Sequence, residues 1–464
     1  MTVLTLDTDR RPLHADTLVR ALEQVAPLVH RPGSDRYAAL TSTLNLSLAV
    51  RPVAVVEATG PADVSATLRL AAAFGVRVGV QSTGHGATET MDGAVLVHTG
   101  SLDELEVHAD ERWARVGAGV RWQTVLDAAA PFGLAGICGS SPDVGVAGFL
   151  TGGGVGPLAR SHGLSADYVR AFEVVTGDGV ARRVTATDEP DLFWGLRGGK
   201  GSLGIVTAVE VDLVELPTFY GGTVIYDAAD ADAVVRTWST WSALLPEEGT
   251  TSIAVMRLPD LEIVPPPLRG RTTVALRFAW VGDPAEGEEM IRAMRAVAAP
   301  ILDDVAVLPY AAIGAVHKDA VEPMPLHETS MLLEDFDLDV VDRFLELVGP
   351  QAPCPLALVE VRQLGGRLRT GDDCAFAHRD APFQLFAAGI AIPEIAQAVV
   401  GASAALEHGL APWARRGGMP NFTVSNGRAW AERVFTAPVA ERLGTVSRAY
   451  DPAAVLLAAR GVRS

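Results

Sequence analysis

The chain has 464 residues, of which 48 % are apolar, so it can bury a large core and is long enough for two or three domains. It carries 56 acidic and 38 basic residues, and the resulting net charge of −18 repels phosphate backbones. We therefore expect no nucleic-acid partner.

The N-terminal segment contains acidic residues and a proline where a secretory signal requires an apolar core. No later run is long and apolar enough for a membrane span. The sequence therefore predicts a cytoplasmic protein without a membrane anchor. Its three cysteines, Cys138, Cys354 and Cys374, are too few and too scattered for a disulfide framework, and they lack metal-site spacing, so we expect no structural metal.

From residue 52 to residue 215, short apolar runs alternate with helical patterns: VAVVEAT, PADVSATLRLAAAFG, VRVGVQST and GAVLVHTG. The helix expected over residues 61–74 begins with proline, has Val64, Leu68 and Ala72 on one face, and stops before Gly75. This alternation predicts an α+β or α/β nucleotide-binding region in which the helix covers a sheet.

Glycine is concentrated in three loops of this region: STGHGAT at 82–88, TGGGVG at 151–156 and RGGKGSLG at 197–204. Such loops let backbone N–H groups approach a ligand closely. The third loop has the spacing GxGxxG, but it follows a helical pattern and precedes a strand, the reverse of a dinucleotide-binding fold. Because Lys200 is followed by Gly201, the loop is not a P-loop either.

After Pro217 the apolar runs become longer, as in TTVALRFAWVG, LALVEVRQLGG and FQLFAAGIAI, with a helical stretch at 287–300 between them. This change indicates a second, substrate-facing α+β domain. The segment from about residue 419 onward is expected to return to the first domain.

His85 lies between two glycines directly after an expected strand. A tight loop there would present backbone donors and an imidazole to one ligand. Taken alone, His85 is explained more simply as a turn histidine with a local hydrogen bond, since a single histidine carries little information.

Three longer segments change this interpretation: GSSPDVGVAGFLTGGGVGPLARSHGLSADYV, EPDLFWGLRGGKGSLGIVTAVEVDL and the terminal YDPAAV. In this order they resemble the FAD-linked oxidases of the vanillyl-alcohol oxidase superfamily, in the branch of berberine bridge enzyme and 6-hydroxy-D-nicotine oxidase. The resemblance covers about residues 53–216 and the last 45 or so. It implies an α+β fold of two domains: a PCMH-type FAD-binding domain from residues 1–215 and 419–464, and a substrate-binding domain from residues 216–418 whose antiparallel sheet covers the flavin.

The resemblance also implies the cofactor and its ligands. His85 would bond covalently to the 8α-methyl carbon of FAD. The remaining flavin contacts would come from Ser82, Thr83, Gly84, Gly86, Ser141, Val144, Gly145, Gly152, Gly153, Gly154, Gly156, Gly204, Ile205, Val206 and Asn421.

Some members of the family hold the flavin by a second bond through a cysteine, at the position where this chain has Ser141. Cys138 is offset from that position by three residues, so we expect a single covalent bond. The chain also departs from the family at Gln81 and Thr83 in the His85 loop. Contacts from the C-terminal tail are in doubt because Ala454, Ala459 and Gly461 replace the family's asparagines.

On the substrate side, the segment 356–366 resembles the strand of the family that lies over the flavin. Period-two alternation places Glu360 and Arg362 on one face. Glu360 would be a base with Arg362 as its oriented partner, or would bind an amine or hydroxyl of the substrate, or the two would form an ordinary surface salt bridge. Phe422 stands where the family often has tyrosine, which moves the base to Glu360, Tyr220 or Tyr310. We assign Glu360, Arg362 and Tyr310 as the candidate catalytic residues.

The resemblance therefore implies oxidation of an alcohol, an amine or a secondary-metabolite intermediate by hydride transfer to FAD, with O₂ as the acceptor. The expected partners are a small-molecule substrate and O₂. Two alternatives remain: a flavin dehydrogenase that excludes O₂, and a flavoprotein that binds a ligand without redox chemistry.

Overall fold

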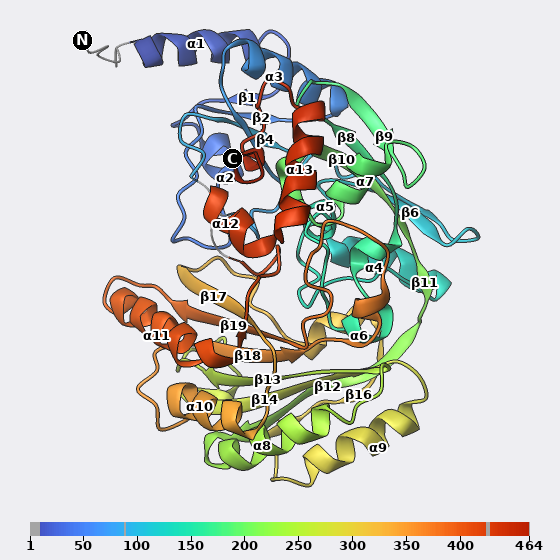
Figure 1. The fold of residues 1–464 in the computed structure, drawn as a ribbon, viewed down its shortest axis with the longest axis vertical. Coiled ribbons are helices and arrows are strands. Elements are labelled where there is room, and N and C mark those ends of the chain that lie inside the picture. Colours follow the sequence, from blue (N-terminus) through green and yellow to red (C-terminus); the bar gives the residue numbers. More distant parts are fainter. Residues whose placement is uncertain (1–9, 88–89, 424–426, 464) are drawn as a thin grey trace.

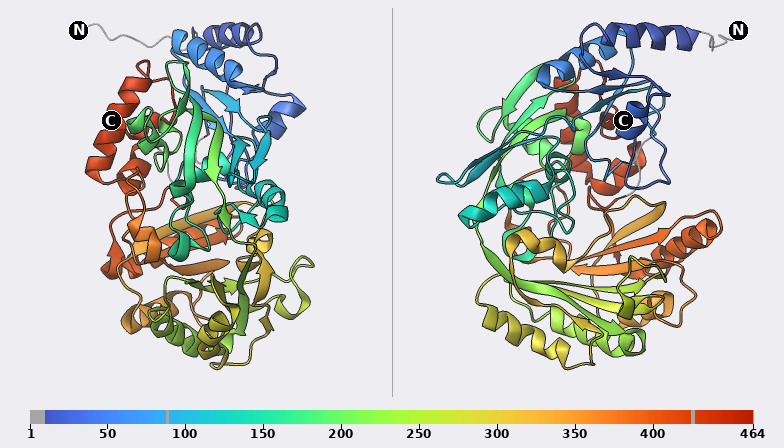
Figure 2. Two further views of the ribbon diagram at one scale, coloured as in Figure 1. Left: turned by 90° about the vertical axis from the view of Figure 1, so that its right-hand side faces the viewer. Right: turned by 180° about the vertical axis from the view of Figure 1, so that it is seen from behind.

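The computed structural model describes residues 10–87, 90–423 and 427–463, and it shows two stacked regions (Figure 1). The upper region in that view contains the strands β1 to β11, together with the C-terminal helices. The lower region is one large antiparallel sheet whose helices lie on the side away from the upper region (Figure 2). This arrangement confirms the predicted α+β fold.

The first sheet of the upper region has the order β1 (Val29–His30), β2 (Ala54–Glu57), β4 (Val95–His98) and β3 (Val78–Gln81). β4 pairs in parallel with β2 and with β3. The predicted helix is α3 (Pro61–Ala73), which buries Val64 and Leu68 completely and is followed, after the C-cap Phe74, by the left-handed Gly75, φ 65°. Helices α1 (Arg10–Leu22) and α2 (Asp35–Leu40) precede it.

A second sheet lies beside the first, in the order β5 (Leu105–His108), β6 (Trp113–Gly117), β10 (Ile205–Asp212), β8 (Val169–Val175) and β9 (Ala181–Val184). A short pair joins β7 (Leu134–Ala135) to β11 (Val214–Glu215). The helices of this part are α4 (Trp122–Ala129), α5 (Val146–Leu150), α6 (Ala159–His162) and α7 (Pro190–Leu196). Because α7 precedes the 197–204 loop and β10 follows it, the predicted reversal of the dinucleotide-binding order is confirmed.

The large sheet has the order β15 (Leu302–Asp303), β12 (Thr218–Asp227), β14 (Thr272–Trp280), β13 (Gly249–Arg257), β18 (Leu358–Gln363), β19 (Phe383–Ile390), β17 (Leu326–Leu333) and β20 (Ala414–Arg415). The ninth strand, β16 (Ala306–Pro309), also pairs with β12. All of its pairings are antiparallel. The three long runs predicted after Pro217 are β14, β18 and β19.

Four helices cover one face of this sheet: α8 (Ala231–Ser242), α9 (Pro284–Arg295), α10 (Leu338–Val348) and α11 (Ala396–Gly409). Val361 of β18 belongs to the apolar core beneath them, together with Trp238 and Phe344. Strand side chains alternate between faces, so Glu360 and Arg362 lie on the opposite face, toward the upper region. Glu360 and Arg362 therefore lie on the face of the large sheet that meets the upper region.

The C-terminal segment returns to the upper region through α12 (Gly427–Val434) and α13 (Ala437–Tyr450). Val78 of β3 donates its N–H to Val455 O at 2.8 Å, and Leu457 N–H donates to Val78 O at 2.9 Å. The tail therefore lies against the first sheet. The domain boundaries at 215/216 and 418/419 remain a prediction, because Ile313 and Val316 from the middle segment belong to the core of the upper region.

Candidate flavin and substrate site

The loop that carries His85 follows β3 and is held by hydrogen bonds to neighbouring segments. Ser82 Oγ donates to Ala118 O at 2.9 Å, and Gly84 O accepts the N–H of Leu44 at 3.3 Å. Gly84 has φ +70°, and a Cβ there would come within 2.7 Å of Ser42 O. Only glycine satisfies both conditions without strain, which is why the sequence has glycine before His85.

Several polar groups of the same loop have no hydrogen-bond partner. Among the described residues, no acceptor is found for the backbone N–H groups of residues 83–87, and neither ring nitrogen of His85 has a hydrogen-bond partner. A Cβ at Gly86 would meet nothing within 4 Å. A row of unpaired donors beside a free imidazole fits an anionic cofactor such as FAD better than a turn histidine with a local hydrogen bond.

Burial lowers the pKa of His85, although the carboxylates of Asp319 and Asp143 partly oppose this effect. The imidazole is therefore neutral at pH 7 and carries a free lone pair.

The second predicted segment, from Ser141 to Gly145, packs directly against the His85 loop. A Cβ at Gly145 would lie 3.2 Å from the methyl carbon of Thr83. Val144 O accepts the N–H of Trp122 at 3.0 Å, which holds the segment on α4. The structure thus brings together two loops that lie far apart in the sequence.

Cys138 is not available for a second flavin bond. Its sulfur is buried 3.8 Å from the hydroxyl of Tyr310, and burial raises the pKa of the thiol to about 12. A thiol that stays protonated is a poor nucleophile. Cys138 therefore acts as a small buried residue of the core.

The predicted glycine loop at residues 151–156 is packed too tightly for side chains. A Cβ at Gly152 would lie 2.0 Å from Asn421 Oδ1, and one at Gly156 would lie 2.0 Å from Cys138 O. Cβ atoms at Gly153 and Gly154 would collide with Phe376 and Phe149. The glycines therefore allow this loop to pass between the C-terminal segment and the 138–139 backbone.

Asn421 braces this loop. Its Nδ2 donates to Phe149 O at 2.9 Å, while its Oδ1 accepts from the ammonium of Lys200, which also donates to Gly148 O at 3.1 Å. Burial lowers the pKa of Lys200 to about 8, so the ammonium remains charged at neutral pH. The sequence excluded Lys200 as a P-loop lysine but gave no signal of its pairing with Asn421.

Gly204, Ile205 and Val206 lie where β10 begins. Ile205 and Val206 pair with Val175 and Val174 of β8, and a Cβ at Gly204 would lie 2.5 Å from the Val174 side chain. These residues are buried in the central sheet, so any contribution to a cofactor would come from their backbone.

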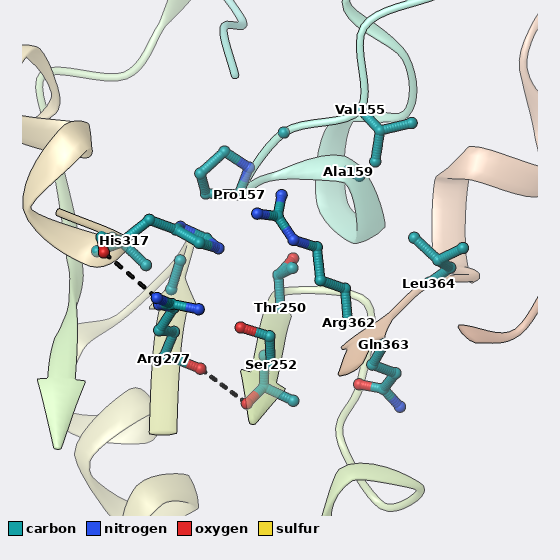
Figure 3. A pocket seen from close by; sticks show the side chains of 14 residues that line it. Val155, Pro157, Ala159, Thr250, Ser252, Arg277, His317, Arg362, Gln363 and Leu364 are labelled. Carbon is teal, nitrogen blue, oxygen red and sulfur yellow. Dashed lines mark hydrogen bonds between the residues drawn. The ribbon is translucent and has the colours of Figure 1, made fainter. Parts of the chain in front are cut away.

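A small cavity, partly open to solvent, lies between the 155–159 segment and the large sheet (Figure 3). One wall is apolar and the other is polar. Its lining residues are Val155, Gly156, Pro157, Ala159, Thr250, Thr251, Ser252, Arg277, Ala279, Val316, His317, Arg362, Gln363 and Leu364. The cavity therefore connects the predicted flavin loop at Gly156 with the predicted substrate strand at Arg362.

Glu360 is the centre of a buried charge cluster below this cavity. It is 0 % exposed, with its carboxylate 2.7 Å from Arg277 Nη1 and 2.9 Å from Arg362 Nη2. Ser252 Oγ donates to it at 2.6 Å. The Glu360–Arg362 pair is therefore buried, and the interpretation of the pair as an ordinary surface salt bridge is wrong.

Burial alone would raise the pKa of Glu360, but the guanidinium groups of Arg277 and Arg362 outweigh it and hold the pKa well below its usual range. The carboxylate is consequently a weak proton acceptor that orders the cations around it.

His317 and Asp319 complete the cluster, and sequence reasoning missed both, together with Arg277. His317 Nε2 lies 3.3 Å from Glu360 Oε1, and Ser140 Oγ donates to Asp319 at 2.6 Å. The segment AVHKDA has no periodicity or motif that would have singled these residues out. Only the folded chain brings them to β18.

Two tyrosines considered as bases do not line the cavity. The Tyr310 hydroxyl donates to Gly136 O at 3.1 Å within the upper core, and that of Tyr220 bonds to Arg295 Nη1 at 3.1 Å on the helix-covered side of the large sheet. The burial of Tyr310 also raises its pKa well above the usual value. We therefore withdraw Tyr310 and Tyr220 as candidate bases. His378 also lies outside the cavity lining.

In the described part of the chain, no three His, Cys, Asp or Glu side chains come together as a metal site would require. None of the described helices has the length and apolar character needed to cross a bilayer.

Comparison with known proteins identifies the upper region. A sequence family described as an FAD binding domain matches residues 52–185. The (R)-6-hydroxynicotine oxidase of Paenarthrobacter nicotinovorans is 34 % identical over 169 residues, 36 % of this chain and 37 % of that protein. The sequence match thus spans little more than a third of this relative.

Similarity to solved structures extends over nearly the whole chain. The 6-hydroxy-D-nicotine oxidase of Arthrobacter nicotinovorans superposes with a TM-score of 0.80 at 22 % identity, covering 94 % of this chain and 97 % of that one. The BBE-like 1 protein of Physcomitrella patens gives a TM-score of 0.82 at 18 % identity, covering 96 % and 98 %. Residues 52–185 therefore match an FAD-binding domain, and the chain has the two-domain fold of the berberine-bridge-enzyme-like and 6-hydroxy-D-nicotine oxidase structures.

Proposed function

We propose that the protein is an FAD-dependent oxidoreductase that oxidises a small organic molecule, with FAD held covalently through His85 and O₂ as the electron acceptor. The single observation that carries the proposal is the His85 loop, in which the imidazole and the backbone N–H groups of residues 83–87 have no partner among the described residues, within a segment that matches an FAD-binding domain. The related (R)-6-hydroxynicotine oxidase supports the reaction class.

The residues of the chain fit the cofactor in two respects. The His85 loop offers backbone donors suited to a pyrophosphate, and Lys200 adds a half-buried positive charge next to the 148–152 segment. When bound, FAD supplies the oxidising chemistry by accepting a hydride from the substrate.

The cavity between the two regions would receive the substrate. Because the cavity lies beside Gly156, a substrate bound there would lie next to the predicted flavin loop, and the polar wall would orient its alcohol or amine group. The apolar wall of Val155, Pro157 and Ala159 would keep water away from the reacting carbon.

The first test precipitates the purified protein with acid and records flavin fluorescence in the denaturing gel. We expect the flavin to stay with the wild-type polypeptide and to be lost from His85→Ala, because only a covalent bond survives denaturation. His408→Ala, at an exposed histidine of α11, is the matched control and should keep its flavin. Release of the flavin from the wild type would contradict the covalent bond but not FAD binding.

The second test adds (R)-6-hydroxynicotine and a panel of secondary alcohols and amines under anaerobic conditions and follows loss of the oxidised flavin absorbance. At least one compound is expected to bleach the flavin, and admitting air should restore the absorbance with consumption of O₂. Bleaching without reoxidation by air would indicate a dehydrogenase. A bound flavin that no compound bleaches would favour the alternative of a flavoprotein that binds a ligand without redox chemistry.

A further inference from the structure

His317 is the cavity residue whose surroundings differ most from those of an ordinary packed histidine. It is 8 % exposed, and neither Nδ1 nor Nε2 forms a hydrogen bond of regular geometry with the described residues. Figure 3 shows its ring in the cavity wall, directed toward the guanidinium of Arg362 and below Pro157. A buried polar group without a partner is costly, so these nitrogens indicate a place for a ligand.

Unpartnered polar atoms cluster around the same cavity. Besides the two ring nitrogens, they include Thr250 Oγ1, Arg277 Nε and Gln363 Oε1, and all of these residues line it. A set that contains both donors and acceptors is complementary to a ligand with its own hydroxyl, amine or carbonyl groups. The polar wall is therefore arranged to hold the reacting polar group of a substrate.

We propose that His317 is the catalytic proton acceptor of this site, with Glu360 as the residue that positions it. The inference rests on the proposed oxidoreductase function. In the reaction, the substrate O–H or N–H bond breaks and its proton goes to His317 Nδ1. The adjacent C–H bond breaks and its hydride, with both bonding electrons, goes to FAD. The product is a carbonyl compound or an imine.

The geometry assigns different tasks to the two ring nitrogens. Nε2 lies 3.3 Å from Glu360 Oε1, outside regular hydrogen-bond geometry but close enough for the negative carboxylate to favour a proton on Nε2. This tautomer leaves the lone pair on Nδ1, which has no protein partner in the part of the chain that is described. Once Nδ1 is protonated, the imidazolium is stabilised by the carboxylate, as in other pairs of histidine and acid.

The charges around His317 keep the ring neutral before the reaction. Burial lowers the pKa of His317, Arg362 and Arg277 lower this pKa further, and Glu360 partly compensates. Arg277 and Arg362 both form ion pairs with Glu360, and Asp319, on the same segment as His317, accepts a hydrogen bond from Ser140. The 155–159 segment opposite contains no titratable side chain. A neutral ring at pH 7 is the form that accepts a proton.

Glu360 is less suited to this step than His317. Its two oxygens are occupied by Arg277, Arg362 and Ser252, and it does not line the cavity. A carboxylate held anionic by two guanidinium groups has little affinity for a further proton. The sequence-based choice of Glu360 thus identified the right cluster, but the structure favours a positioning role for this residue.

The test compares wild type, His317→Gln, His317→Ala and the control His378→Gln, a buried histidine outside the cavity lining. All four are first checked for flavin content. Anaerobic flavin reduction is then measured across pH with the compound that bleaches the wild type fastest. We expect His317→Gln to slow reduction about 100-fold or more and to lose the decrease in rate at acidic pH. Imidazole added to His317→Ala should restore part of the rate, whereas His378→Gln should keep the wild-type pH profile.

A readout independent of turnover follows the ring carbons of ¹³C-labelled histidine by NMR, with His317→Gln to assign the signal. The His317 signal should titrate below the usual histidine pKa of about 6.5. An imidazolium at pH 7 would overturn the inference, as would a His317→Gln enzyme that reduces its flavin at the wild-type rate with an unchanged pH profile. If the wild type itself is not bleached by any compound, the proposed function fails and the inference fails with it.

Discussion

At the scale of single residues, the site depends on charges that are buried but paired. The negative charge of Glu360 balances the positive charges of Arg277 and Arg362, which are 3 % and 8 % exposed. Removing one partner of such a cluster leaves the others without compensation, and this costs more than the ion pair itself contributes.

We therefore predict that Glu360→Gln lowers the free energy of unfolding by about 3–5 kcal/mol, since two guanidinium groups would remain buried next to a neutral amide. Urea denaturation at pH 7 measures the change. Glu346→Gln is the control, because the Glu346–Arg343 pair is exposed and should contribute at most about 1 kcal/mol. A loss at Glu360 no larger than that of the control would show that the cluster is solvated.

At the scale of elements, the His85 loop contains two glycines in different surroundings. Gly84 is left-handed and lies against Ser42, whereas a Cβ added at Gly86 would have no neighbour within 4 Å. The two glycines are two residues apart and should respond in opposite ways to the same methyl group.

Gly84→Ala is expected to cost about 1–3 kcal/mol of stability, because alanine is strained at this backbone conformation and would meet the Ser42 carbonyl. Gly86→Ala should leave stability within about 0.5 kcal/mol but reduce flavin loading, since its methyl group enters the space assigned to the cofactor. Urea denaturation and the ratio of flavin absorbance to protein absorbance separate the two effects. Full flavin loading in Gly86→Ala would place the cofactor elsewhere.

At the scale of the whole molecule, several contacts tie the two regions together. Ile313 and Val316 from the middle of the chain pack in the upper core, and Arg160 of α6 donates to Gly249 O at 2.8 Å and to Leu364 O at 2.7 Å in the large sheet. The regions therefore share buried contacts instead of meeting at a solvated surface.

This coupling predicts one cooperative unfolding transition. Far-UV circular dichroism, which follows both regions, and flavin fluorescence, which follows the upper one, should give the same thermal midpoint. Separate midpoints would show that the regions unfold independently.

The sequence by itself determined the elements and their kind. Local periodicity and end signals are sufficient for α3, β14 and β18, and the glycine loops are recognisable because a backbone that approaches a ligand or another backbone excludes side chains. Alternation along β18 also placed Glu360 and Arg362 on the same face. These properties depend on neighbouring residues, which the sequence shows directly.

Only the tertiary structure decided what surrounds those residues. It showed that Glu360 is fully buried, that Arg277 and His317 join it from other segments, and that Tyr310 lies in the upper core. The burial of a group and the identity of its ion-pair partners depend on contacts between residues far apart in the chain. Together they set the pKa of that group. Glu360 could therefore be found from the sequence, but its role as a charged partner of His317 could not.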